Sequence, residues 1–328
     1  MATKKTEKQN KEPAIGTVEH ITEWNGDIID RRMEGVLLFD VREGVYTKDP
    51  GTNSSRVDEE TGQLLGTPMC LKRKIRNYGQ HTDEQVLVKA GVVLQEEHKK
   101  ALATAKKNKD DVRGVLCKKY LDTRWFGHVI TGLGRAGGSV WGALQVTTQR
   151  SVEAAYSLEM PITRICPARK NKSEVEGEEG AGTGQFGNMP DNPYALYRSE
   201  IFVSPTRARQ RENGYFGTGT TWQDLAKFFK ALQLMFELDR AADRGVMTTR
   251  RVIMFEHPNM IGISKADHNF NRVTVERVAE TKEKQFASSY KDYRVAVDTK
   301  GLGKVQCWEY DLDKDEDGNG EVIRTRLG

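Results

Sequence analysis

The run TWQDLAKFFKALQLMFELDRAA, residues 221–242, constrains the fold of this chain more than any other stretch. Thr221 and Asp224 have the spacing of a capping box, which marks where a helix begins. The apolar residues recur every three or four positions and form a wide stripe along one side of that helix, at Leu225, Phe228, Phe229, Leu232, Met235 and Phe236. A stripe this wide must be buried, so the run is expected to be a core helix.

A second helix is predicted near the start of the chain. Thr67 supplies an N-cap and Pro68 suits the first turn of a helix. The following residues place a buried stripe at Leu71, Ile75 and Tyr78. A strand at Val36–Val41 precedes this helix, and a long Gly-, Asn- and Asp-rich loop separates the two.

Further strand-like runs follow at intervals along the chain. They are VLVKAG (86–91), RWFGHVIT (124–131), SVWGALQVTTQRSV (139–152), YALYRSEIFVS (194–204), RRVIMFEH (250–257), FNRVTVERV (270–278) and DYRVAVDT (292–299). The resulting order is strand, helix, two strands, helix and strand, which is the order of a ferredoxin-like unit and of RNA-recognition modules. The sequence therefore predicts an α+β fold.

Composition excludes several classes of protein. The chain has 328 residues, 30% of them charged, and no apolar run long enough to span a membrane. The polar N-terminus has no signal-peptide core, so we expect a cytoplasmic protein without membrane contact. The four cysteines and six histidines form no C-x-x-C or H-E-x-x-H motif, so no metal or disulfide framework is expected. His128, within a predicted strand, is more typical of a structural histidine than of a catalytic one.

The segment GLGRAGG places Gly132, Gly134 and Gly137 in a G-x-G-x-x-G pattern. That pattern binds a dinucleotide only where a strand enters the loop and a helix follows at once. Here a second strand-like run follows, so the glycines are predicted to join two strands, and no cofactor is expected. A nucleotide-cofactor oxidoreductase remains the weakest of the alternatives.

Positive charge is unevenly distributed, although the net charge is only +4. On the helix that begins at Pro68, Lys72, Arg73 and Arg76 fall beside the buried stripe and close to one another. Three cations on one short face repel each other unless an anion is near. A solvated surface is the alternative explanation.

Two segments lack a periodic apolar pattern. Residues 1–30 are expected to be a flexible N-terminal extension, followed by one elaborated domain over 31–328. Between the strand-like ITRI and YALYRSEIFVS lies a glycine-rich, charged excursion, which predicts a projecting hairpin or arm.

Several motifs together resemble a known family. They are LLFDVREG, DPGTNSSRVDEETG, CLKRKIRNY, YLDTRWFG, GALQVTTQRSVE, MPITRI, YALYRSEIFVS and MFELDRAADRG, in order from about residue 32 to about 280. The chain resembles the backbone subunit of type I CRISPR interference complexes, Cascade, in the Csd/Csh branch and closest to the I-C subtype. One departure is Trp141, at a place where the family often carries an arginine.

The resemblance implies an RRM-like palm with a helical finger insertion at about 80–120 and a thumb hairpin at about 165–195. Such subunits stack head to tail in a filament along the CRISPR RNA and present it to a target DNA strand. The implied partners also include a large subunit, a small subunit and a repeat-handle-binding subunit. The family members bind and do not cut, so no enzymatic activity is expected.

A subunit that holds RNA without reading its sequence needs cations for phosphates, closely approaching backbone amides and a wedge between bases. The predicted RNA-binding residues are Arg56, Lys72, Arg73, Arg76, Gly137, Gly138, Arg150 and Arg164. Phe186 or Met189, expected at the thumb tip, would be the wedge. A metal-dependent ribonuclease that uses Asp40, Asp49 or Asp58 is the second hypothesis.

Overall fold

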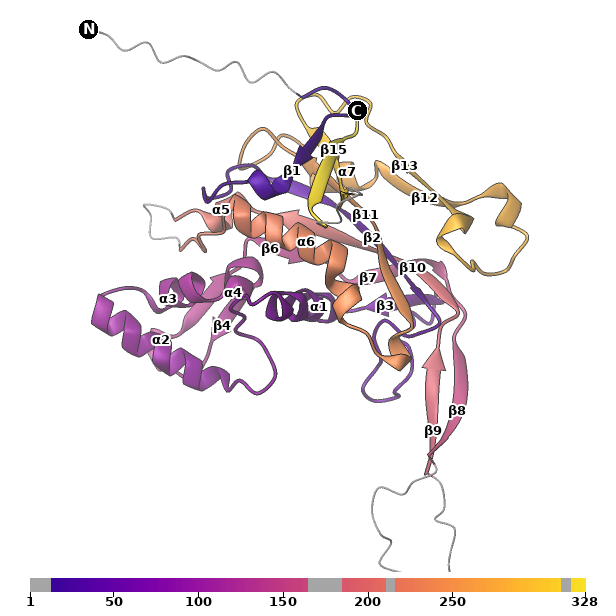
Figure 1. The fold of residues 1–328 in the computed structure, drawn as a ribbon, viewed down its shortest axis with the longest axis horizontal. Coiled ribbons are helices and arrows are strands. Elements are labelled where there is room, and N and C mark those ends of the chain that lie inside the picture. Colours follow the sequence, from indigo (N-terminus) through magenta and orange to yellow (C-terminus); the bar gives the residue numbers. More distant parts are fainter. Residues whose placement is uncertain (1–12, 165–184, 211–215, 314–319) are drawn as a thin grey trace, which may run out of the picture.

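The computed structural model describes residues 13–164, 185–210, 216–313 and 320–328 (Figure 1). Within these residues a nine-stranded antiparallel sheet forms the centre of the molecule, in the order β1-β15-β14-β11-β2-β10-β7-β3, with β6 also paired to β10. Its strands are β1 (Val18–His20), β2 (Met33–Arg42), β3 (Gln63–Gly66), β6 (Leu144–Val146), β7 (Gln149–Ala154), β10 (Tyr194–Val203), β11 (Val246–Glu256), β14 (Gln306–Leu312) and β15 (Val322–Arg326).

The middle of this sheet is the predicted ferredoxin-like unit. Along the chain it runs β2, α1 (Pro68–His81), β7, β10, α6 (Trp222–Leu238) and β11. In the sheet these strands lie in the order β11-β2-β10-β7, so the first strand of the unit is paired on both sides. The α+β expectation is therefore confirmed, and strands β14, β15 and β1 extend the sheet beyond β11.

Helices α1 and α6 cover one face of the sheet, as their apolar stripes predict. All six stripe residues of α6 are buried, as are Leu71, Ile75 and Tyr78 of α1. They join Leu37, Phe39 and Val41 of β2 in the largest apolar cluster. The intervening Val36 and Leu38 point to the opposite face, where β12 (Val273–Arg277) and β13 (Tyr293–Val297) pack over the sheet beside α7 (Ala266–Phe270).

A helical lobe is inserted between α1 and β6. It consists of α2 (Leu94–Asn108), α3 (Val112–Lys119), α4 (Leu121–Phe126) and the hairpin of β4 (Gly127–Ile130) and β5 (Gly138–Trp141). A separate apolar cluster holds the lobe together, with Ala101 and Leu116 from the helices against Ile130 and Val140 from the hairpin. The lobe thus extends beyond the expected finger at 80–120. The strand–loop–strand prediction around the glycines is confirmed.

A second hairpin, β8 (Leu158–Arg164) with β9 (Gln185–Asp191), projects from the body of the protein (Figure 1). It is the base of the arm that the sequence predicts. The remaining segments are α5 (Pro205–Ala208) and five short 3₁₀ turns at Ile21–Glu23, Gly134–Ala136, Ala242–Arg244, Ala279–Thr281 and Tyr290–Asp292.

Three local predictions are wrong at least in part. In RWFGHVIT, residues 124–126 are the end of helix α4, and the strand begins only at Gly127. VLVKAG forms no strand, because the backbone N–H groups of Leu87 and Val88 donate to the buried Asp122 carboxylate instead of to a neighbouring strand. In the N-terminal segment, β1 pairs with β15, and Ile21 and Ile29 are buried, so the described part of residues 1–30 is not loosely held. Its apolar residues are too sparse to give a periodic pattern.

Both edges of the sheet are short strands. β1 has three residues and pairs with β15, and β3 has four and pairs with β7. The outer side of β3 is partly covered by an isolated bridge between Val57 and Leu64. No helix in the described ranges has the length and apolar character needed to cross a membrane.

The capping box at the start of α6 gives a first test. The Thr221 hydroxyl accepts from the Asp224 amide at 3.1 Å, and the Asp224 carboxylate accepts from the Thr221 amide at 3.2 Å. We expect Thr221→Ala to lower the free energy of unfolding by about 1 kcal/mol, and Thr221→Ser to preserve it, because serine caps equally well. Urea titrations of the three proteins measure this, and coincident midpoints would contradict it.

Candidate nucleic-acid interface

Three cations converge where α1 meets the insertion and α5. Lys72 and Arg76 of α1 lie above the Phe126 ring, with their charged atoms 5.2 and 5.1 Å from its centroid. Lys72 Nζ also donates to Gln145 Oε1 at 2.8 Å, and Arg207 of α5 donates to the Gly142 carbonyl at 3.4 Å. We call Lys72, Arg76 and Arg207 the cationic cluster.

The cationic cluster is electrostatically strained. Burial lowers the pKa of Lys72, and the nearby guanidinium groups of Arg76 and Arg207 lower it further. Among the described residues neither Lys72 nor Arg207 forms an ion pair with a carboxylate. Like charges held this close favour a bound anion, which would relieve their repulsion.

Arg76 has a structural partner as well. Its Nε donates to Asp122 Oδ2 at 2.8 Å, and the same carboxylate accepts the amide protons of Leu87 and Val88. Asp122 is 1% exposed and the Arg76 side chain 12% exposed, so this pair is shielded from water. Arg76 therefore neutralises a buried charge, and Lys72 and Arg207 supply the excess positive charge of the cluster.

This difference predicts unequal effects on stability. We expect Arg76→Ala to lower the free energy of unfolding by about 3 kcal/mol, because it leaves the buried Asp122 carboxylate without its counter-charge. Lys72→Ala is expected to change it by less than about 1 kcal/mol, since Lys72 neutralises no carboxylate. Chemical denaturation of both variants measures the difference, and equal losses would contradict the assignment.

The other predicted phosphate-binding arginines lie elsewhere. Arg73 is exposed and donates to the Val88 carbonyl at 3.3 Å, towards the insertion. Arg56 pairs with Asp49 at 3.1 Å, and Arg150 pairs with Asp58. Arg56 and Arg150 are close to one another, because the Leu65 amide bonds to the Arg56 carbonyl while Leu65 pairs with Arg150 across β3 and β7. The structure thus separates these candidates into a group on α1 and a group where β3 meets β7.

Gly137 and Gly138 lie at the turn of the β4–β5 hairpin. A Cβ at Gly137 would come within 2.7 Å of the Ile130 carbonyl oxygen, so the hairpin itself requires glycine there. Gly138 is exposed, and a Cβ would meet nothing closer than Arg113 at 4.0 Å. Close approach of a ligand to these amides stays a prediction.

The predicted thumb is described only at its base. Residues 165–184 of the expected thumb lie outside the described residues. Arg164 and Phe186 are in the stem, at the β8 and β9 positions farthest from the sheet, where Arg164 pairs with Gln185 and Phe186 with Thr163. Met189 pairs with Met160 within the stem, so its expected place at the tip is wrong.

The three aspartates of the ribonuclease hypothesis are held apart by separate partners. Asp40 is buried and accepts from Arg250 at 2.8 Å and from the Tyr194 hydroxyl at 2.9 Å; burial raises its pKa. Backbone hydrogen bonds, chiefly from Gly51, lower the pKa of Asp49, and the Arg150 bond lowers that of Asp58. The described residues contain no group of three or more His, Cys, Asp or Glu side chains suited to a metal ion.

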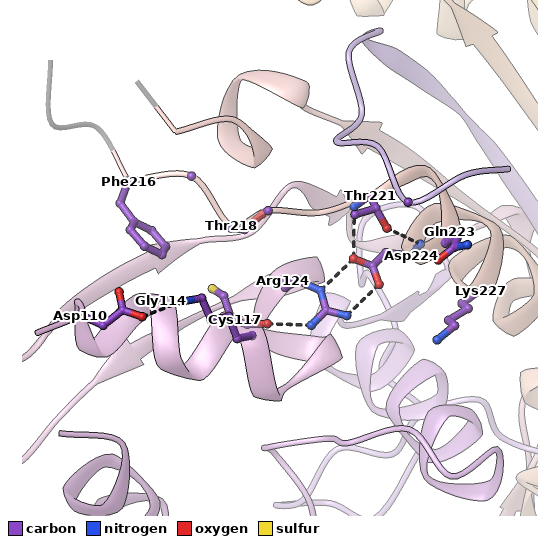
Figure 2. Close-up of a pocket in the computed structure, with 14 residues that line it drawn as sticks. Asp110, Gly114, Cys117, Arg124, Phe216, Thr218, Thr221, Gln223, Asp224 and Lys227 are labelled. Atoms are coloured by element: carbon purple, nitrogen blue, oxygen red, sulfur yellow. Dashed lines mark hydrogen bonds and ion pairs between the residues drawn. The ribbon is translucent and has the colours of Figure 1, made fainter. Parts of the chain in front are cut away.

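A pocket of about 610 Å³ lies between α3 and the start of α6 (Figure 2). Arg124 and Asp224 face each other at its centre, 2.7 Å apart. Its two lysines are also neutralised, Lys118 by Asp110 and Lys227 by Glu84. Each of these cations has a carboxylate, so this pocket is a poorer anion site than the cationic cluster.

A histidine pair joins α2 to the β4–β5 hairpin. His98 Nδ1 lies 2.9 Å from the Thr131 carbonyl oxygen and must donate to it. His98 Nε2 therefore accepts from His128 Nε2, 2.6 Å away, when both rings are neutral. Burial lowers the pKa of His128 to about 4, with a further contribution from His98. His128 is a structural residue, as its sequence context indicates.

This pair predicts a pH dependence of stability. The folded-state pKa of about 4 lies below the unfolded value of about 6.5, so the unfolded chain binds the proton first as pH falls. The contribution of His128 is complete above about pH 6.5 and is lost towards about pH 4. We expect His128→Asn to flatten this part of the profile of unfolding free energy against pH. The exposed His81→Asn is the control, and an unchanged profile for His128→Asn would contradict the assignment.

Comparison with known proteins identifies the family. Residues 31–298 match the family described as CRISPR-associated protein Cas7. The chain belongs to the Cas7 family. The match covers the ferredoxin-like unit, the insertion, the β8–β9 hairpin and the β12–β13 pair of this Cas7 chain. A search of curated proteins finds no match.

Solved structures show distant similarity to this Cas7 chain. A chain of a "CRISPR RNA-guided surveillance complex, pre-nicking" is 13% identical, with a TM-score of 0.41 over 68% of this chain and 78% of that one. A "CRISPR RNA-guided surveillance complex" chain is 14% identical, with a TM-score of 0.38 over 68% of each chain. A chain of the "Type III-B Cmr-beta bound to cognate target RNA" is 10% identical, with a TM-score of 0.36 over 68% and 60%. The family assignment rests on the family match.

Sequence reasoning missed two members of the interface. Arg207 lies in the basic run RARQR, but only the fold brings it to α1, through the short helix α5. Gln145, which accepts from Lys72, has no distinguishing signal in the sequence because its role depends on β6 pairing with β10.

Proposed function

We propose that this Cas7-family chain binds CRISPR RNA as the backbone subunit of a type I interference complex, closest to the I-C subtype. The observation that carries the proposal is the cationic cluster, in which Lys72 and Arg207 have no carboxylate among the described residues. A ribose-phosphate chain supplies closely spaced negative charges without regard to base sequence. The family assignment supports this choice of anion.

In this proposal the copies stack head to tail along one guide and present it to a target DNA strand. A few phosphate contacts per copy bind weakly alone, but many copies on one RNA act multivalently. A large subunit, a small subunit and a repeat-handle-binding subunit would complete the assembly. Co-expression with a CRISPR array tests this, because RNA of one defined length should co-purify with the protein.

The cationic cluster predicts a specific salt dependence. We expect the double variant Lys72→Ala, Arg207→Ala to bind single-stranded RNA more weakly than wild type, whatever the base sequence of the RNA. The slope of log affinity against log salt should fall by about 1.4, since each phosphate contact on a single strand contributes about 0.7. Filter binding over a potassium chloride series measures both quantities.

The matched control is Lys300→Ala with Lys304→Ala, which removes the same charge from the exposed loop between β13 and β14. We expect this control to keep the wild-type slope. An unchanged slope in the cluster variant would remove the cluster from the RNA interface.

We further propose that the subunit does not cut RNA. Asp49 and Asp58, the half-buried members of the ribonuclease hypothesis, are each paired with a different arginine. Labelled RNA incubated with the pure protein and magnesium is therefore expected to keep its full length on a denaturing gel. Metal-dependent shortening that Asp49→Asn abolishes would favour the ribonuclease instead.

A further inference from the structure

The β4–β5 hairpin has an inner and an outer face with different chemistry. Ile130 and Val140 point inward and are buried against the helices of the insertion. Val129 and Trp141 alternate with them and point outward, with exposed fractions of 62% and 61%. An exposed indole on a hairpin that is already packed on its other side is not needed for the core.

Trp141 is unusual among the tryptophans of this chain. Of the five, Trp125, Trp222 and Trp308 are buried and Trp24 is half-buried, so only Trp141 is exposed. Its partner across the hairpin is Gly127. A Cβ at Gly127, whose φ is +78°, would lie 2.2 Å from the Val140 carbonyl oxygen, so this position must stay without a side chain. The residue opposite Trp141 across the hairpin therefore has no side chain.

Trp141 also lies beside Arg207 of the cationic cluster. The Arg207 guanidinium carbon lies 5.8 Å from the indole centroid, and Arg207 bonds to the carbonyl of Gly142, the next residue. Phe126, beneath Lys72 and Arg76, directly precedes Gly127. The same corner of the protein thus presents an aromatic surface and excess positive charge.

The Gln145 side chain, which lies beside the cationic cluster, is already hydrogen-bonded within the protein. Gln145 accepts from Lys72 through Oε1, and its amide nitrogen donates to the Phe126 and Gly142 carbonyls at 3.3 and 3.4 Å. Gln145 is therefore not available to recognise the edge of a base. An aromatic ring with adjacent cations recognises any base by its face and the backbone by its charge.

We propose that Trp141 stacks on an unpaired base of single-stranded RNA while Arg207 and Lys72 neutralise the flanking phosphates. This inference rests on the proposed function and adds to it a contact that does not depend on phosphate charge. An acidic protein segment is the competing occupant. RNA is favoured because a base supplies a flat aromatic face next to a phosphate, which matches the indole beside the cations.

The test compares the full-length wild type with Trp141→Ala and Trp141→Phe. The probe is a fluorescein-labelled single-stranded RNA oligonucleotide, with a second oligonucleotide of equal length and charge in which the bases are replaced by abasic sites. We expect Trp141→Ala to bind the ordinary RNA about tenfold more weakly and Trp141→Phe to stay within about threefold of wild type. The salt slope should be unchanged in both, since no charge is removed.

On the abasic oligonucleotide the three proteins should bind alike, because there is no base to stack. Tryptophan fluorescence of the wild-type protein gives an independent readout, which does not depend on whether a variant folds. RNA should quench the exposed indole of the wild type, and the abasic oligonucleotide should quench it far less. In Trp141→Phe the RNA-dependent quenching should be lost.

The outcomes separate this inference from the proposed function. If Trp141→Ala binds RNA as wild type does, or loses affinity equally on both oligonucleotides, stacking is overturned and RNA binding stands. If Trp141→Ala keeps its RNA affinity but self-associates less, the indole is a protein contact, which also overturns the inference. If the wild type binds neither oligonucleotide, both the proposed function and the stacking inference fail.

Discussion

The buried carboxylate of Asp122 sets the geometry on which the candidate interface depends. It accepts Arg76 from α1 and the amide protons of Leu87 and Val88 from the inserted segment, all at the base of α4. These three bonds fix the insertion against the core helix. Phe126 at the end of α4 thereby lies beside Lys72 of α1, and the hairpin that carries Trp141 begins at the next residue, Gly127. One desolvated charge thus organises a surface formed by segments far apart in the sequence.

Charge pairing differs between the cationic cluster and its surroundings. Arg124 is neutralised by Asp224 and Lys74 by Asp239. Lys72 instead bonds to the neutral Gln145 side chain, and Arg207 bonds to the Gly142 carbonyl. The net charge of +4 therefore does not describe the local charge of this surface. The modest total suits a protein that has to hold a polyanion at one site without binding it over its whole surface.

The elements with strong local signals could be predicted from the sequence. The ferredoxin-like core could be predicted from the capping box and stripe of α6, the N-cap and stripe of α1, and the strand-forming run at Val36–Val41 in β2. Predictions failed where tertiary hydrogen bonds decided the structure: Leu87 and Val88 lie in a β-prone run, but Asp122 takes their amides. Among the candidate residues, Lys72 and Arg76 were found from helical spacing, whereas Arg207 joins them only in three dimensions.

The two short edge strands limit how copies of this chain can meet. β1 and β3 expose too few backbone groups for a neighbour to lengthen the sheet. A contact between folded copies would then be made away from the two edges of the nine-stranded sheet. Short edges of this kind protect a folded protein from aggregating through its main sheet.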